Sequence, residues 1–482
     1  MSVGSRTFVD ENPATREELA ELEDADAESV DRAVRRACEA FPGWAALPGR
    51  ARGRIMNRLA DVLEEHGPRL AELESADNGR PLRETTAQQA IIPGFYRYFA
   101  GWCDKIEGST IPVEGDYLNY TERVPVGVCG AITPWNHPLL IATKKIAPAL
   151  ACGNVVVVKP SELAPLSVVE LGRLAREAGL PEGVLTVVTG QREAGQALTV
   201  HPGVDRIDLT GSTATGIAIQ QQAAPTMKRI GLELGGKAAN VVFADADFGA
   251  AVEGAAFAGY IGQGQTCIAG ARVLVERPLL DRFLDAFATR VQGIRVGDPL
   301  ASGTQMGPQI SAAARERTES YVSGALDEGA VLLAGGERPE LEERLREGHF
   351  YAPTILLTED DRIRAAQEEI FGPVVTVIPF AGEDEAVAIA NGVDFGLGAA
   401  VWTRDVARAL RVARRLRAGT TWVNDYHRID PASPWGGFKL SGYGRENGEE
   451  AIRMFTEVKS TWVRLAEPSQ GWYESSDDER LN

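Results

Sequence analysis

The sequence predicts an α/β protein built on two parallel sheets, which implies two domains. The chain has 482 residues, of which 44% are hydrophobic, so it can bury a sizeable core in each domain. From about residue 120, short β-rich runs alternate with helical stretches, and this alternation is typical of parallel sheets. A second series of the same kind begins near residue 238.

Helices are expected over residues 28–105, before the first strand. Segments such as VDRAVRRACEAF and ARGRIMNRLADVLEEH carry apolar residues three and four positions apart, which places them on one helix face. The candidate strands of the first sheet are VGVCGAI, NVVVVKP, VLTVVTG and RIDLTGS. Those of the second sheet are NVVFAD, ARVLVE, TILLT, VVTVIPF and TTWVND. Residues 466–482 are acidic, rich in serine and without periodicity, so we expect a mobile tail.

The composition limits the kinds of binding partner and the cellular location that we expect. A formal net charge of −18 argues against a nucleic-acid or anionic-membrane partner, because phosphate binding needs clustered positive charge. The first residues are acidic and polar where a signal peptide would be basic and then apolar, and no apolar run is long enough to span a membrane. We therefore expect a cytoplasmic protein. The five cysteines are odd in number and scattered, which predicts free thiols and neither a disulfide framework nor a metal site.

Two segments at strand ends are candidates for binding a nucleotide. Lys159 and Glu162 follow an apolar strand, at the carboxyl end where open α/β sheets bind ligands. A carboxylate there can bond a ribose diol and would repel the extra phosphate of NADP, which favours NAD; the alternative is a solvated loop with ordinary surface charges. Gly211 and Ser212 begin a predicted helix through Ala223, whose first amides can face a pyrophosphate, although Ser212 can equally be a plain N-cap.

Three further residues suit nucleophilic chemistry. Cys267 ends the loop GQGQTC, where a thiol is accessible, although most single cysteines are inert and buried. Glu233 lies among apolar residues, before paired glycines that would let the backbone turn sharply. Burial raises a carboxyl pKa, so Glu233 is either a general base or an incidental acid in a turn. Asn136, in the segment TPWNHP, can donate to an oxyanion or cap the following helix.

Taken in order, these motifs resemble the aldehyde dehydrogenase superfamily. The resemblance rests on PWN, KPSE, GST, ELGGK and GQxC, followed by EEIFGPV, NGxxxGL, WGGFKxSG and FTEVK, and it covers nearly the whole chain except its two ends. It implies an aldehyde dehydrogenase-like fold with a Rossmann-type cofactor-binding domain (1–105 and 125–237), an α/β catalytic domain (238–445) and a β-rich oligomerisation arm (106–124 and 455–465). Trp435 and residues 424–435 are similar to betaine aldehyde dehydrogenases in part.

The resemblance also assigns roles, position by position. It implies that Cys267 is the nucleophile, that Glu233 is the general base and that Asn136, with the Cys267 backbone amide, forms the oxyanion hole. Lys145 and Glu446 match supporting or proton-relay residues. The implied cofactor contacts are Ile132, Thr133, Pro134, Trp135, Lys159, Ser161, Glu162, Gly211, Ser212, Leu234, Gly235, Glu369 and Phe371. The implied substrate channel comprises His137, Lys144, Ile261 and Trp435. The positions that link these regions to a neighbouring subunit are Arg229, Arg445 and Glu457.

The implied reaction is the NAD-dependent oxidation of an aldehyde to a carboxylic acid. The Cys267 thiolate attacks the aldehyde carbon, amide donors hold the oxyanion, and hydride passes to the nicotinamide. Glu233 then activates the water that hydrolyses the thioester, and no metal is required. Two alternatives stay open. A CoA-acylating relative is disfavoured by Glu233 as a water-activating base, and a catalytically idle structural or binding protein is disfavoured by the full set of reacting residues.

The substrate prediction rests on His137, Lys144 and Trp435, where the sequence departs from the commonest pattern of the superfamily. An ammonium at Lys144 would repel the quaternary amine of betaine aldehyde and attract an anionic or polar aldehyde, because cation recognition needs aromatic faces. We therefore predict a semialdehyde, or an aromatic aldehyde packed on Trp435. The resemblance further implies a homodimer or homotetramer.

Overall fold

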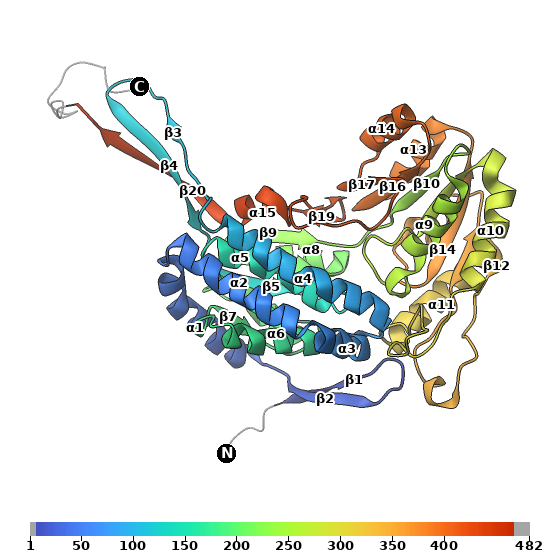
Figure 1. Ribbon diagram of the computed structural model, residues 1–482, viewed down its shortest axis with the longest axis horizontal. Helices are drawn as coiled ribbons and strands as arrows, with labels where there is room; N and C mark the ends of the chain where they lie inside the picture. Colours follow the sequence, from blue (N-terminus) through green and yellow to red (C-terminus); the bar gives the residue numbers. More distant parts are fainter. Residues whose placement is uncertain (1–5, 467–482) are drawn as a thin grey trace.

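The computed structural model describes residues 6–466 and confirms the α/β architecture with two separate parallel sheets (Figure 1). The two sheets lie toward opposite ends of the molecule, each covered by helices, and a slender β arm projects beyond the first of them. The predicted acidic tail lies outside the described residues from residue 467 onward.

Four helices precede the first parallel sheet, as the apolar spacing predicts. They are α1 (Ala27–Ala45), α2 (Gly49–Glu65), α3 (Gly67–Asn78) and α4 (Leu82–Trp102). Their apolar faces share one core with the sheet and with α5 (Pro138–Ala151). Trp44 of α1 is buried, and its indole Nε1 donates to the Leu150 carbonyl of α5 at 3.2 Å. Within the described residues, every helix is too short or too polar to cross a bilayer.

The first parallel sheet has the strand order β19-β9-β8-β5-β6-β7. Its strands are β5 (Val128–Ile132), β6 (Val155–Lys159), β7 (Leu185–Val187), β8 (Arg206–Thr210), β9 (Arg229–Glu233) and the antiparallel edge strand β19 (Gly442–Tyr443). The intervening helices are α6 (Leu166–Glu177), α7 (Arg192–Val200) and α8 (Thr213–Ala223). The chain runs outward from β5 to β7 and then returns to β8 on the other side of β5. The strand order therefore reverses between β5 and β8, and ligands bind at the carboxyl ends of such a switch point.

The second sheet has the order β12-β13-β14-β11-β10-β16-β17 and is parallel except at β12. Its strands are β10 (Ala239–Val242), β11 (Arg272–Glu276), β12 (Val331–Ala334), β13 (Thr354–Leu357), β14 (Val374–Phe380), β16 (Gly398–Trp402) and β17 (Thr420–Val423). Two buried clusters pack on it. One is built with α9 (Phe248–Tyr260) and α10 (Leu280–Gln292), and the other with α11 (Ala312–Asp327), α12 (Arg364–Gln367), α13 (Glu383–Asn391) and α14 (Val406–Arg415).

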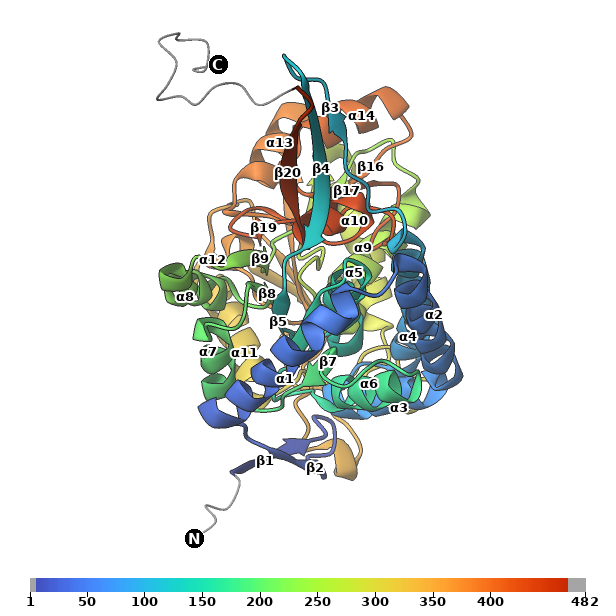
Figure 2. The same cartoon turned by 90° about the vertical axis from the view of Figure 1, so that its left-hand side faces the viewer.

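The arm is a three-stranded antiparallel sheet that projects away from both parallel sheets (Figures 1 and 2). Its strands are β3 (Thr110–Ile111), β4 (Tyr117–Pro125) and β20 (Thr456–Arg464), which follows the short helix α15 (Gly448–Met454). Near its base, Arg229 Nε lies 2.7 Å from Glu457 Oε1, while Arg445 donates to backbone carbonyls elsewhere. Two of the three predicted linking residues are thus paired with each other.

Some strands differ from what the sequence predicts. β1 (Thr7–Glu11) and β2 (Glu18–Glu23) form an unpredicted hairpin at the edge of the molecule (Figure 2). β9, β12 and β16 are also additional, as are the two-residue strands β15 (Phe395–Gly396) and β18 (Phe438–Lys439). All the predicted strands of the two sheets are present.

Candidate active site

A cleft of about 540 Å³ opens at the carboxyl ends of β5, β6 and β8, next to the reversal of strand order. Eight of the predicted cofactor residues line it, namely Ile132, Thr133, Pro134, Trp135, Lys159, Ser161, Glu162 and Gly211. Sequence motifs far apart in the chain are thus brought to the one place where an open α/β sheet offers a nucleotide site.

The polar groups of the cleft suit a nucleotide. Lys159 is buried, and its Nζ lies 3.0 Å from Glu162 Oε2. Ser212 is the N-cap of α8, and its Oγ accepts a hydrogen bond from the Thr215 amide. Thr215 itself lines the cleft, so the amino end of α8 faces this space. Ser212 is therefore both a plain cap and part of a helix start at which an anion is stabilised.

A second pocket of about 250 Å³ adjoins the cleft, because Pro134, Trp135, Thr210 and Gly211 line both. The remaining predicted cofactor residues line the second pocket, namely Ser212, Leu234, Gly235, Glu369 and Phe371. Cys267, Asn136 and His137 line it as well. A dinucleotide lying in the cleft can thus extend toward the thiol.

The loop that holds Cys267 has an unusual backbone. Gly262, Gln263 and Gly264 have φ angles of 57°, 59° and 68°, in the region that favours glycine. A Cβ on Gly264 would lie 2.2 Å from the carbonyl oxygen of Gly372, so only glycine fits there. The Gln263 side chain donates to two backbone carbonyls, which holds its left-handed conformation. Such conformations persist where the surroundings enforce them, and they cluster at active sites.

The paired glycines after Glu233 allow a close approach, which corrects the expected sharp turn: neither has a positive φ. A Cβ on Gly236 would lie 2.2 Å from the Cys267 carbonyl oxygen, and one on Gly235 would lie 2.3 Å from Glu369 Oε2. The Gly236 amide donates to Glu369 Oε1 at 2.8 Å. Burial raises the pKa of Glu369 to about 7. The ELGGK segment thus lets Cys267 and Glu369 lie against the same short stretch of backbone.

Cys267 and Asn136 face the second pocket together. Burial raises the pKa of the Cys267 thiol to about 12, and the Lys144 ammonium is the largest opposing influence. Asn136 Nδ2 donates to the Gln265 carbonyl at 2.8 Å, which leaves its second N–H for another acceptor. The alternative role of Asn136 as a helix cap is not observed, because the N-cap position of α5 is His137.

Glu233 is buried but does not line the second pocket. Neither of its carboxylate oxygens has a hydrogen-bond partner among the described residues. Burial and then the negative Glu446 raise the pKa of Glu233 to about 8, against the effect of Lys144 and Lys145. Its charge also raises the pKa of Cys267. Of the three reacting residues that the resemblance implies, Cys267 and Asn136 therefore face one pocket, and Glu233 acts on the thiol through its charge.

Lys144, predicted as a charged residue of the substrate channel, forms a buried ion pair. Its Nζ lies 2.7 Å from Glu446 Oε2 and 4.5 Å from the centroid of the Trp435 ring. Lys145 Nζ lies 2.8 Å from Glu446 Oε1. Against the effect of burial, the two ammonium groups lower the pKa of Glu446 to about 2. Two ammonium groups share one carboxylate, so the cluster keeps a positive charge, but Lys144 lines neither the cleft nor the second pocket.

This arrangement leads to a prediction for Lys144. In Lys144→Met the positive charge that opposes the effect of burial on Cys267 is lost, so the thiol pKa rises further. A rise of one unit lowers the thiolate fraction about tenfold, and the rate of iodoacetamide alkylation at pH 8 should fall by the same factor. Lys105→Met, which removes an exposed lysine, is the control. An unchanged pH profile of alkylation in Lys144→Met would remove Lys144 from the control of the thiol.

The remaining channel residues are uncharged. His137 is buried, and its Nδ1 lies 2.6 Å from Gln88 Oε1. Burial holds the pKa of His137 well below its usual value, so the imidazole is neutral at pH 7. Ile261 begins the short helix η2 (Ile261–Gly264) that leads into the Cys267 loop, and it lines neither the cleft nor the second pocket.

An apolar, aromatic cluster packs against the Cys267 side chain. Its aromatic members are Trp422, Tyr426 and Trp435. The rings of Trp422 and Tyr426 have centroids 4.9 Å apart. None of these three rings, the predicted channel residue Trp435 included, lines the cleft or the second pocket.

Some lining residues escape sequence reasoning. Arg317 and Ile141 line the second pocket, and Arg317 Nη2 donates to the Glu369 carbonyl at 2.6 Å. In the sequence, Arg317 lies in the charged run ARERTES, which has the composition of a solvated helix face. The cleft also receives residues at and just before α7, namely Gln191, Arg192, Gly195, Gln196 and Thr199.

A thiol next to the second sheet faces a pocket, and this pocket adjoins the nucleotide cleft of the first sheet. The fold and the site together define the class of protein as a dinucleotide-dependent oxidoreductase. Comparison with known proteins narrows this class. The model of the aldehyde dehydrogenase family matches residues 2–461, and this chain belongs to that family. It is therefore an oxidoreductase that acts on aldehydes.

Individual relatives agree with this assignment. The chain is 46% identical over 468 residues to DhaS of Bacillus subtilis, covering 96% of this chain and 94% of the relative. It is 42% identical to the betaine aldehyde dehydrogenase of the same organism, covering 96% and 95%. Among solved structures, PnpE in complex with nicotinamide adenine dinucleotide has a TM-score of 0.96 and 44% identity, covering 98% of this chain and 97% of that chain. The predicted family, fold class and enzyme class are confirmed.

Proposed function

We propose that this protein oxidises an aldehyde to a carboxylic acid with NAD as cofactor, through a thioester on Cys267. The observation that carries this proposal is the shared pocket. Cys267 and Asn136 both face it, and it adjoins the cleft at the switch point of the first sheet.

The residues of the two spaces fit NAD. Lys159 and Glu162 stand where the adenosine ribose would lie, the amino end of α8 suits the pyrophosphate, and Glu369 is fixed by the Gly236 amide near Cys267. Glu162 places a carboxylate where NADP would carry a phosphate, which favours NAD. NAD bound there supplies the hydride acceptor. The NAD complex of PnpE is consistent with this cofactor.

The first covalent step belongs to Cys267. The thiol gives up its proton, and Sγ forms a bond to the carbonyl carbon while the carbonyl oxygen becomes an oxyanion. The second N–H of Asn136 and the Cys267 backbone amide are the donors proposed for that oxygen. Losing one such donor typically costs about 3 kcal/mol of transition-state stabilisation.

The hydrolytic step belongs to Glu233. With a pKa of about 8, roughly a tenth of this carboxyl is ionised at pH 7, and it ionises fully at mildly alkaline pH. No hydrogen bond among the described residues holds its oxygens, and in our proposal the side chain turns toward the thioester. It takes a proton from water, the hydroxide adds to the thioester carbonyl, and the Sγ–C bond breaks to release the acid. Lys145 and Glu446 are proposed to support this step from the buried ion pair.

The substrate proposed here is a neutral aromatic aldehyde, one of the two classes predicted from the sequence. Trp422, Tyr426 and Trp435 belong to the buried cluster against which Cys267 packs, so the surroundings of the thiol are apolar, although these rings line neither the cleft nor the second pocket. Lys144 is paired with Glu446 and does not line the second pocket, which weakens the attraction predicted for a semialdehyde. The Lys144 ammonium also occupies the cation position over Trp435, which a trimethylammonium group would need.

A panel of three aldehydes tests this choice. Benzaldehyde should give a kcat/KM at least about tenfold higher than succinate semialdehyde or betaine aldehyde, because the apolar cluster that packs against Cys267 favours a ring over an ionic group that must lose its water. NADH production is followed without CoA, with NAD and NADP in parallel. A preference for betaine aldehyde or the semialdehyde would overturn the substrate proposal. Turnover only with CoA would favour the acylating alternative, and no turnover with any aldehyde would favour the idle one.

Assembly into a homodimer or homotetramer stays a prediction. Its support is the arm, which exposes the apolar side chains Tyr117, Leu118, Val458, Trp462 and Val463. An exposed apolar surface of this kind is typical of a protein–protein contact.

A further inference from the structure

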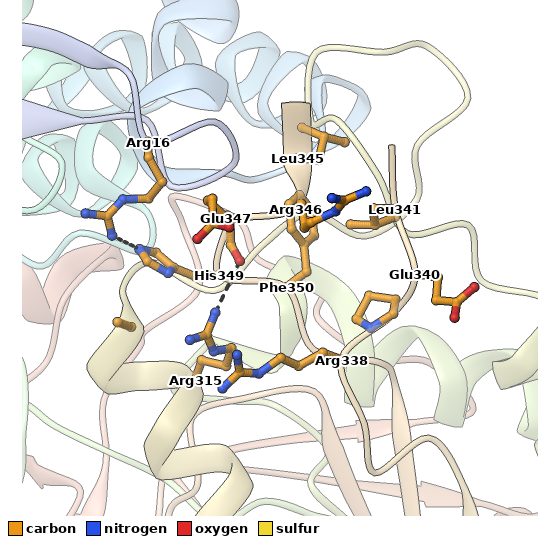
Figure 3. Close-up of a pocket in the computed structure, with 13 residues that line it drawn as sticks. Arg16, Arg315, Arg338, Glu340, Leu341, Leu345, Arg346, Glu347, His349 and Phe350 are labelled. Atoms are coloured by element: carbon orange, nitrogen blue, oxygen red, sulfur yellow. Dashed lines mark hydrogen bonds between the residues drawn. The ribbon is translucent and has the colours of Figure 1, made fainter. Parts of the chain in front are cut away.

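A large cavity lies away from the active site, at a junction of three segments (Figure 3). It has a volume of about 950 Å³ and is lined by the loop between β1 and β2, the start of α11 and residues 338–350. None of its lining residues lines the cleft or the second pocket. The proposed reaction therefore leaves this cavity without a role.

The cavity is rich in guanidinium groups, although the chain as a whole has a net charge of −18. Its lining contains Arg16, Arg315, Arg338 and Arg346. Figure 3 shows Arg315 and Arg338 reaching into the same part of it from different segments. Arginine is the side chain best suited to oxyanions, because its planar fork donates two parallel hydrogen bonds.

Carboxylates balance part of this charge. Glu11 Oε2 lies 2.8 Å from Arg16, and Glu319 Oε1 lies 2.8 Å from Arg338 and 3.6 Å from Arg315. Glu340 and Glu347 also line the cavity, but both are exposed, so solvent screens their charges. No salt bridge to Arg346 is found among the described residues.

One buried donor in the lining, His349 Nδ1, lacks an acceptor among the described residues. Arg16 Nη1 lies 2.7 Å from His349 Nε2, and a guanidinium only donates, so Nε2 accepts and Nδ1 carries the imidazole proton. His349 is only 5% exposed, and its Nδ1 has no hydrogen-bond partner among the described residues. Burial lowers the pKa of His349 to about 4, with smaller contributions from the charges of Arg16 and Arg315. The imidazole is therefore neutral at pH 7. Arg315 Nε is also buried, and it already faces a carboxylate, because Glu319 Oε1 lies 3.6 Å from it.

Buried polar atoms in native proteins are nearly always hydrogen-bonded, so the unmet Nδ1 of His349 calls for an explanation. It is an N–H donor on a ring that accepts from Arg16, in a cavity lined by three further arginines. A ligand that satisfies it must bring an acceptor oxygen, and the arginines favour a ligand with negative charge. The volume is far larger than a single carboxylate needs, and the arginines come from three separate segments.

We propose that this cavity is a binding site for a small organic polyanion, a di- or tricarboxylate or a phosphate ester, held by Arg315, Arg338 and Arg346 with the His349 Nδ1–H as a neutral donor. Binding joins the β1–β2 loop to α11 and to residues 338–350. The bound protein is therefore more resistant to unfolding than the free protein. This proposal is independent of the reaction proposed for Cys267.

Isothermal titration calorimetry of the full chain with citrate, with pyrophosphate and with acetate at equal ionic strength tests the site. One citrate or pyrophosphate per chain should bind saturably, acetate should not, and the midpoint of thermal unfolding should rise with the bound ligand. Binding of citrate would identify the ligand class as polycarboxylates, and binding of pyrophosphate would identify it as phosphate esters. The titrations are repeated with saturating NAD, because the nucleotide cleft also suits anions. Displacement of the ligand by NAD would place it in the cleft and overturn the proposal.

Two exposed arginines of the lining allow a test that does not threaten folding. Arg338→Gln and Arg346→Ala should each weaken binding about tenfold, the effect expected for a lost charge-assisted hydrogen bond. Arg414→Ala, an exposed arginine of α14 outside the cavity, is the matched control and should bind as the native chain does. Binding that neither lining variant weakens, or the absence of saturable binding by the native chain, would overturn the proposal.

Discussion

The C267A variant is expected to lose NADH production with every aldehyde by about 10⁴-fold or more, while it still binds NAD. Without the sulfur no thioester forms, and removal of a catalytic nucleophile commonly costs several orders of magnitude. Cofactor binding should persist because Cys267 lines only the second pocket and not the cleft. Steady-state absorbance measures the first effect, and calorimetric titration with NAD measures the second.

Cys38→Ala is the matched control for this variant. Cys38 is an exposed thiol of α1, whereas Cys267 is half-buried at the second pocket. The control should retain native kcat and KM. NADH production by C267A at the native rate would remove Cys267 from the reaction and with it the thioester. Loss of NAD binding in C267A would instead show that the pocket collapses, and the variant Cys267→Ser would then be needed to separate chemistry from packing.

The helices and the central strands follow from local patterns because their apolar spacing matches the face that they bury. β16 does not, since its residues Gly398, Ala399 and Ala400 have little intrinsic strand preference. It is a strand because β10 and β17 flank it on both sides. The β1–β2 hairpin is also set by pairing, such as Phe8 opposite Leu22, within a stretch that is otherwise rich in acids. Tertiary contacts override local preference in both places.

In the candidate site, too, some features follow from the local sequence and others depend on tertiary contacts. Cys267 and Asn136 are predicted from their motifs and do face one pocket. The environment of Lys144 cannot be predicted in this way, because its partner Glu446 belongs to a distant motif. Lys145 and the same Glu446 lie 301 positions apart in the chain. A lysine that looks like a free charge in the sequence is thus held in a buried ion pair outside the second pocket, and the substrate that we propose changes with it.

Replacement of Glu233 by glutamine is expected to stop the reaction after the first turnover. Glutamine cannot take a proton from water, so the acyl group should remain on Cys267, and loss of a general base typically lowers turnover by about 10²- to 10⁴-fold. One NADH per active site should form in a rapid burst, followed by a slow steady rate. Stopped-flow absorbance measures the burst, and mass spectrometry of the intact protein detects the acyl adduct.

The pH dependence gives this assignment a second, independent measurement. The active form of Glu233 is the carboxylate, and burial with Glu446 raises its pKa to about 8. Native turnover limited by hydrolysis should therefore fall as the pH drops below about 8 and level off above about 9, whereas Glu233→Gln should lose this dependence. Glu182→Gln, an exposed glutamate far from the pocket in the chain, should keep the native profile. If Glu233 were needed before hydride transfer, Glu233→Gln would show no burst. That result would assign Glu233 to the activation of the thiol and not to the hydrolytic step.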